Sequence, residues 1–88
     1  MSKTSMEIHD SDMSDEMQRE ALQVGLLAVN MYSQGIDIAT YMVKEFERKH
    51  GLTWHCFIGS SGSHVRPNQN GYICFSVGGK RIVLFRTD

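Results

Sequence analysis

The spacing of apolar residues changes once along the chain, near Gly51, and this change predicts two kinds of structure. Before Gly51 the apolar residues recur every three or four positions, at Met17, Ala21, Val24, Ala28 and Met31 and again at Ile38, Met42 and Phe46. This is the helical period, so one helix is predicted within residues 12–34 and a second over residues 37–49. Each helix should present one apolar stripe to a core.

Residues with capping chemistry stand near the predicted helix ends. Ser14 is predicted to cap the first helix, because Asp15 and Glu16 follow it and suit the positive end of the helix dipole. Asp37 is predicted to cap the second helix. Gly51 follows the last periodic residues and has the position of a C-terminal helix stop.

After Gly51 the pattern alternates with a period of two, and aromatic and β-branched residues are frequent. These features predict strands at 53–58, 63–66, 72–77 and 80–86. Gly78 and Gly79 separate the last two strands and are typical of a two-residue hairpin turn. Residues 1–11 are polar and aperiodic, so we expect a flexible tail before one domain of residues 12–88. The predicted fold class is α+β, with two N-terminal helices packed on an antiparallel sheet.

Length and composition add one expectation, a second subunit. A chain of 88 residues forms one domain but buries only about 60–65% of its unfolded surface, so its monomer should be marginally stable. Such chains usually gain stability from disulfides, a metal or oligomerisation. No apolar secretory stretch is seen near the start, so Cys56 and Cys74 are expected to stay reduced. Oligomerisation is therefore favoured.

Charge is distributed unevenly, although the net charge is only −1. The first 50 residues carry nine acidic and five basic residues, whereas residues 51–88 carry four basic residues and one acid. The small net charge gives no reason to expect nucleic acid. No apolar run approaches the roughly 18–20 residues that cross a bilayer, so direct membrane insertion is not expected. The mildly basic second half better suits a peptide with some acidic residues.

The stretch TWHCFIGSSGS, residues 53–63, places a histidine beside a cysteine. Such a pair suggests a thiol nucleophile with its base, or two metal ligands. In a strand, however, successive side chains point to opposite faces, so His55 and Cys56 cannot act together. No second pair of ligands has zinc spacing. We expect no catalytic residue, no metal and no cofactor, and interpret Cys56 as a small buried apolar residue.

The glycines of the same stretch, Gly59 and Gly62, resemble those of the loop by which KH domains hold single-stranded RNA. That loop joins two helices and offers basic residues, whereas this one joins two predicted strands. The short strand that follows is ended by Pro67 and has an edge without an evident partner. A second copy of the chain or an extended peptide could pair with that edge. An edge protected only by Arg66 and Pro67 is equally consistent with the pattern.

Four short motifs occur in one order along the chain: DMSDEMQ at 12–18, DIA at 37–39, KEF at 44–46 and TWHC at 53–56, the last followed by a glycine, a Gly-Ser pair and a valine. Each motif is weak alone, but the set is highly specific. With these motifs the chain resembles the eight-kilodalton dynein light chains, which are small dimeric hub proteins. The similarity extends from about residue 10 to residue 86.

The resemblance implies a strand-exchanged homodimer in which residues 63–66 join the sheet of the partner. It further implies two symmetric grooves that bind extended linear motifs by strand addition, commonly with a Thr-Gln-Thr core. Family members are not enzymes. They bind the dynein intermediate chain and many other proteins, and the implied location is the cytoplasm, on the microtubule cytoskeleton.

The resemblance also implies site residues by position. The implied groove is lined by Ser61, Gly62, Ser63, His64, Val65 and Arg66, and its floor is formed by Tyr72, Cys74, Ser76, Arg81 and Val83. The implied dimer contacts are His55, Ser63, His64, Val65 and Arg66. The other side of the same strand, with Trp54, Cys56 and Ile58, is expected to pack against the helices.

The chain departs from the family pattern within this groove. Gly35 and Ile36 stand where the family has an acidic residue and a lysine, and Cys74 and Ser76 stand where it has tyrosines. Arg81 replaces a small apolar residue. Because aromatic anchors often dominate binding, a shallower and more basic groove predicts a preference for acidic ligands, or weak binding. The alternative is a divergent structural paralogue that acts through its dimer and has a degenerate groove.

Overall fold

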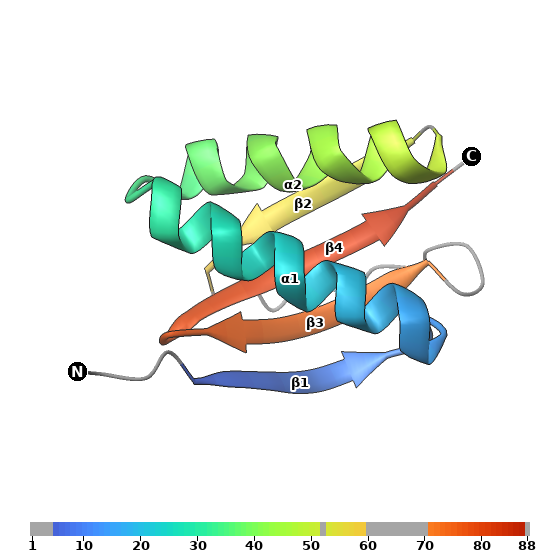
Figure 1. Ribbon diagram of the computed structural model, residues 1–88, viewed down its shortest axis with the longest axis horizontal. Coiled ribbons are helices and arrows are strands. Elements are labelled where there is room, and N and C mark those ends of the chain that lie inside the picture. The colour runs from blue at the N-terminus through green and yellow to red at the C-terminus, as the bar shows by residue number, and fades with distance from the viewer. Residues whose placement is uncertain (1–4, 52, 60–70, 88) are drawn as a thin grey trace.

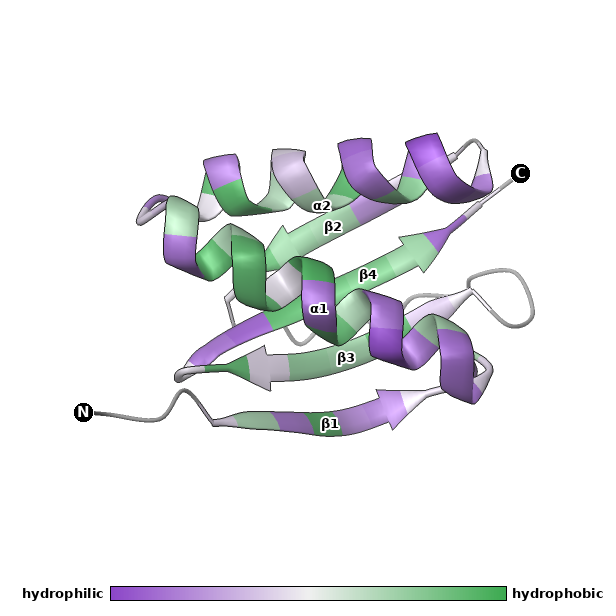
Figure 2. Ribbon diagram, viewed as in Figure 1, coloured by the Kyte–Doolittle hydropathy of each residue, from purple (hydrophilic) through white to green (hydrophobic). Residues whose placement is uncertain are grey.

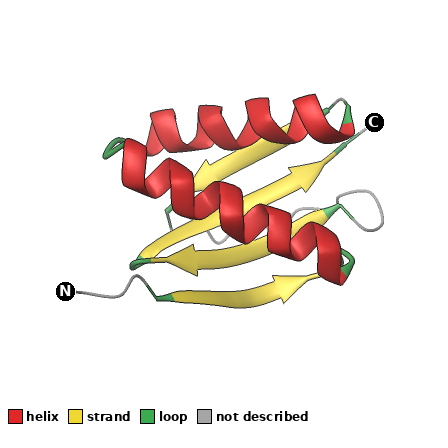
Figure 3. Ribbon diagram, in the orientation of Figure 1, coloured by secondary structure: helices red, strands yellow, loops and turns green. Residues whose placement is uncertain are grey.

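The computed structural model describes residues 5–51, 53–59 and 71–87. Along the chain the elements are β1 (Met6–Ser11), α1 (Asp15–Met31), α2 (Gly35–His50), β2 (Trp54–Ile58), β3 (Tyr72–Val77) and β4 (Lys80–Arg86). The strands form one antiparallel sheet in the order β1-β3-β4-β2. Both helices lie on the same face of this sheet (Figures 1 and 3). The predicted α+β fold is confirmed.

A side-chain cap marks the start of α1, and a glycine marks the end of α2. The Ser14 hydroxyl accepts a hydrogen bond from the backbone N–H of Met17 at 3.2 Å, as predicted for the cap of α1. The prediction that Asp37 caps α2 is wrong, because the helix begins two residues earlier, at Gly35. Asp37 instead lies in the first turn, where its charge still suits the helix dipole. Gly51 ends α2 with a φ of 83°, which confirms the predicted stop.

The N-terminal segment corrects the expectation of a flexible tail over residues 1–11. Residues 6–11 form β1, which pairs antiparallel with β3 from Met6↔Val77 to Ser11↔Ile73. The backbone N–H of Asp12 also donates to the carbonyl oxygen of Tyr72 at 3.0 Å. The tail prediction fails because β1 is specified by pairing with a distant strand, which local polarity does not reveal. Residues 1–4 lie outside the described ranges.

The C-terminal strands agree closely with the sequence pattern. The predicted strands 72–77 and 80–86 are β3 and β4, and the predicted strand 53–58 begins one residue later, as β2. Gly78 and Gly79 form the hairpin turn with positive φ values of 55° and 85°, the conformation that favours glycine at both positions. The predicted strand 63–66 falls outside the described residues.

The core fills the space between the helices and one face of the sheet. Its fully buried members include Ala21 and Ala28 of α1, Ile38, Met42 and Phe46 of α2, and Ile73, Phe75, Ile82 and Leu84 of the central strands. Figure 2 shows how hydrophobic residues gather along β3 and β4, while both helices alternate between polar and apolar residues. Among the described helices, none is both long and apolar enough to cross a membrane. Among the described residues, no helix covers the opposite face of the sheet (Figure 1).

Candidate functional site

The sheet face opposite the helices carries its own apolar cluster. Cys74 of β3 lies directly across from Val83 of β4, and Tyr72 lies across from Phe85. Cys74, Val83 and Phe85 are each less than 10% exposed, and Tyr72 packs against them. An antiparallel sheet that had one fully solvated face would place polar residues there. This apolar cluster is instead buried within the single chain, and at the edge strand β2 it adjoins Phe57, which is 47% exposed.

The five residues predicted to form a groove floor lie together on this face. Tyr72, Cys74 and Ser76 alternate along β3, and Arg81 and Val83 occupy the facing positions of β4, with Ser76↔Arg81 and Cys74↔Val83 as cross-strand pairs. Their common placement follows from the two-residue period of the strands. Their role in ligand binding stays a prediction. The predicted groove lining, Ser61, Gly62, Ser63, His64, Val65 and Arg66, lies outside the described residues, as do the dimer contacts predicted at 63–66.

His55 and Cys56 point to opposite sides of β2, as the strand geometry predicts. The His55 ring lies on the face opposite the helices, where it stacks on Phe85 at 5.2 Å and its Nε2 is 2.9 Å from the hydroxyl of Thr87. Cys56 packs against the core cluster on the other side. Burial raises the pKa of the Cys56 thiol to about 12. The thiol is therefore protonated at neutral pH, and it lacks the thiolate character of a nucleophile.

The helix-facing side of β2 is apolar, which confirms the expected packing of Trp54, Cys56 and Ile58. The Trp54 ring makes an edge contact with Phe46 of α2, with 4.9 Å between ring centroids. Beside Cys56 a hollow of about 260 Å³ is lined by Ala39, Thr40, Val43 and Lys44 of α2. Within the described ranges β2 is an edge of the sheet. An apolar hollow therefore lies next to a strand edge.

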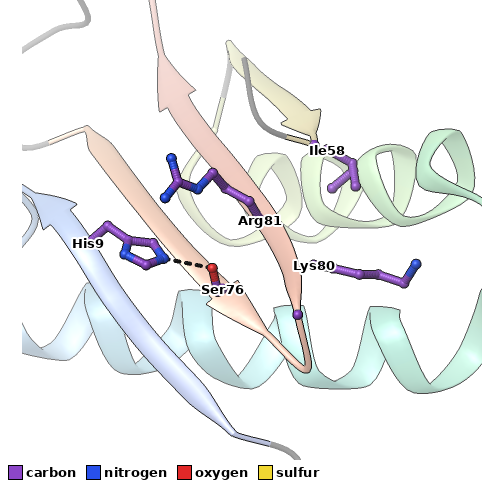
Figure 4. A pocket seen from close by; sticks show the side chains of 7 residues that line it. His9, Ile58, Ser76, Lys80 and Arg81 are labelled. Carbon is purple, nitrogen blue, oxygen red and sulfur yellow. Dashed lines mark hydrogen bonds between the residues drawn. The ribbon is translucent and has the colours of Figure 1, made fainter. Parts of the chain in front are cut away.

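A second cleft, of about 620 Å³, is lined by residues from all four strands and from the β3–β4 turn. Its lining includes His9, Ser76 and Arg81, and Figure 4 shows the His9 ring directed at Ser76. The His9 Nε2 and the Ser76 hydroxyl are 2.7 Å apart. Sequence reasoning missed His9 because it assigned residues 1–11 to a tail. The alternation of Met6, Glu7, Ile8 and His9 was the signal that could have indicated a strand.

Metal binding has no support in the part of the chain that the structure describes. Among those residues, no three His, Cys, Asp or Glu side chains gather closely enough to hold an ion. The ion pairs there are short-range or bridge the helices, as between His50 Nε2 and Glu20 at 2.7 Å.

Two helices on one face of a four-stranded antiparallel sheet, with an apolar patch on the other face, define a small two-layer α+β domain. The sequence profile of the family described as dynein light chain type 1 matches residues 5–87. The protein named "Dynein light chain, cytoplasmic" from Emericella nidulans is 40% identical over 86 residues, covering 97% of this chain and 92% of that protein. The chain belongs to the dynein light chain type 1 family.

Solved structures agree with this assignment. The dynein light chain-like domain of the Fasciola hepatica calcium binding protein FhCaBP2 superposes with a TM-score of 0.80 and 26% identity, covering 98% of this chain and 94% of that one. A mercury derivative of the same domain gives a TM-score of 0.77 with 26% identity, covering 94% and 92% of the two chains. The described part of the chain therefore has the fold of the family.

Proposed function

We propose that this protein is a non-catalytic, homodimeric light chain of a dynein motor that binds extended segments of partner proteins by strand addition. The observation that carries the proposal is the sheet face opposite the helices, which is apolar and ends at the edge strand β2. A strand edge supplies backbone donors and acceptors, and a neighbouring apolar face supplies side-chain contacts. Together they suit association with a second copy and with a peptide.

Aromatic side chains at β2 support the dimer part of the proposal. Phe57 is 47% exposed on the face opposite the helices. Its ring lies 5.7 Å from Phe85, which also stacks on His55. An exposed aromatic side chain beside a strand edge is typical of a contact surface rather than of a solvated one. In the proposed dimer, His55 and Phe57 lie at the subunit contact, and the segment 63–66 crosses to the partner.

Family membership supports the proposed setting and partners. The Emericella nidulans relative is named as a cytoplasmic dynein light chain. We place this protein likewise in the cytoplasm on microtubule-associated motors, bound to the dynein intermediate chain or to other proteins with linear motifs. Two identical grooves in a twofold dimer would hold two copies of a partner and raise the effective affinity of each weak site. The proposed function includes no catalytic step, in keeping with a Cys56 thiol that is half-buried against the core and a neighbouring His55 that faces the other way.

A second candidate function has one observation in its favour. Cys74 and Ser76 are short side chains on the predicted groove floor, and they offer little surface to anchor a peptide. With such a floor, the protein could act through its dimer alone, as a structural subunit of the motor. The two candidates make opposite predictions for peptide binding.

Calorimetric titration separates these candidates. A short peptide with a Thr-Gln-Thr core is titrated into wild-type protein whose dimeric state has been established by sedimentation. The peptide-binding function predicts saturation at one peptide per protomer. No binding heat at several temperatures, from a protein that is dimeric, would contradict the groove and favour the structural role.

A further inference from the structure

Three side chains from three strands converge at the cleft beside the β3–β4 turn. His9 comes from β1, Ser76 from β3 and Arg81 from β4. An irregularity in the β1–β3 register falls between Ile8 and Asp10, so His9 is the residue at a bulge. Bulges commonly re-aim a side chain, and here the ring is directed at Ser76, with 2.7 Å between Nε2 and the hydroxyl oxygen. The backbone bulge therefore sets the direction of the His9 side chain.

Arg81 completes the group from the other side of Ser76. Ser76 and Arg81 are direct cross-strand partners, and the Arg81 side chain extends from β4 toward β3 (Figure 4). No carboxylate among the described residues forms an ion pair with Arg81. A guanidinium stays charged at all physiological pH values and offers several donors in one plane. Arg81 therefore brings a positive charge to the cleft, and this charge has no ion-pair partner among the described residues.

Three other charged residues surround this group: Glu7, Asp10 and Lys80. The Glu7 carboxylate lies 4.0 Å from Nδ1 of His9, whereas the Ser76 hydroxyl is near Nε2. The Glu7 side chain is 76% exposed, so solvent screens its charge. Asp10 pairs with Cys74, farther along β3. Lys80 also borders the cleft, but its side chain extends in a different direction from Arg81 (Figure 4).

We propose that His9, Ser76 and Arg81 form an anion-receiving subsite for an acidic side chain of a bound peptide, either a carboxylate or a phosphate. The inference rests on the proposed function, in which this sheet face is the floor of a peptide groove. The guanidinium supplies a charged partner, and the histidine and serine supply polar hydrogen atoms around one cleft. The subsite gives the groove a preference for acidic ligands where its floor offers few aromatic anchors.

A peptide series tests the subsite. The parent carries a Thr-Gln-Thr core with neutral flanks, and each flanking position is replaced in turn by glutamate, phosphoserine or glutamine. At one position, glutamate should bind about three- to fivefold more tightly than glutamine, as expected for a partly exposed charge pair. Phosphoserine should gain at least as much, because it carries more charge. The gain should shrink as ionic strength rises.

Two variants locate the effect. Arg81→Gln should remove the advantage of glutamate over glutamine while leaving the affinity for the neutral parent nearly unchanged. Lys80→Gln is the matched control, because it removes the same charge from the adjacent residue, whose side chain points elsewhere. His9→Gln should reduce the advantage less than Arg81→Gln does, since it removes a polar partner rather than the permanent charge.

The outcomes separate this inference from the proposed function. Higher affinity with both glutamate and phosphoserine supports a general anion subsite. Higher affinity with phosphoserine alone assigns the subsite to phosphorylated ligands. Binding of the parent with no position at which an acid improves affinity would overturn the subsite and leave the groove standing. The subsite would also be overturned if Arg81→Gln and Lys80→Gln reduced the affinity advantage of glutamate over glutamine equally. The positive charge of the whole region would then explain the preference for acidic peptides. Failure of every peptide would remove groove and subsite together.

Discussion

At the scale of single residues, the geometry of β2 decides the chemistry of its His-Cys pair. Adjacent residues on a strand belong to different surfaces, so Cys56 joins the core and His55 joins the face opposite the helices. Burial raises the pKa of the Cys56 thiol from 9.0 to about 12. The raised value couples the protonation of this thiol to folding.

This coupling predicts a loss of stability at alkaline pH. Between about pH 9 and about pH 12 the unfolded chain loses the Cys56 proton while the folded chain keeps it. The free energy of unfolding should therefore contain a contribution that is fully present below about pH 9 and decreases as pH rises toward 12. Urea unfolding of wild type and of Cys56→Ala, measured across this range, reports the contribution. The wild type should lose stability more steeply with pH, and parallel curves for the two proteins would contradict the prediction.

At the scale of secondary-structure elements, the sequence predicted what depends on local pattern. Helical periodicity located α1 and α2, the Ser14 cap was correct, and the Gly78-Gly79 turn separated β3 from β4 as expected. The Asp37 cap failed because Gly35 and Ile36 can enter the helix, and α2 begins at Gly35 without a side-chain cap. β1 was missed because its pairing partner, β3, lies about 60 residues farther along the chain.

Hydrogen exchange checks the assignment of β1 as an element. A flexible tail would exchange its amide hydrogens at the rate of an unstructured peptide, whereas paired strand amides are protected. We expect protection at the amide of Asp12, whose N–H donates to the carbonyl of Tyr72, and at alternate amides of β1. The exposed turn between the helices at Ser33 provides an internal reference. Exchange of the β1 amides as fast as that of Ser33 would show that the strand is not stably formed.

At the scale of the whole molecule, the sequence predicted the layers and the family, but only part of the candidate site. The family resemblance named Tyr72, Cys74, Ser76, Arg81 and Val83 together, and the alternation along β3 and β4 explains why they share one face. His9 could not be added, because its place depends on β1 and on a bulge that no sequence pattern marks. The groove lining from Ser61 to Arg66 stays a prediction. The observation that supports the proposed subunit contact is the exposed Phe57 at the edge strand β2, beside the apolar cluster of Cys74, Val83 and Phe85.

Sedimentation equilibrium of wild type and of Phe57→Glu tests this reading of the sheet face most directly. The proposed subunit contact predicts a dimer for the wild type. For Phe57→Glu it predicts a dimer dissociation constant at least about tenfold higher, because the substitution places a charge in the contact. Leu27→Glu is the matched control, since Leu27 is similarly exposed, at 45% against 47%, but lies on α1. Its dimer should match the wild type, and circular dichroism should show that both variants fold. A monomeric wild type, or a Phe57→Glu protein as dimeric as the wild type, would contradict the proposed subunit contact.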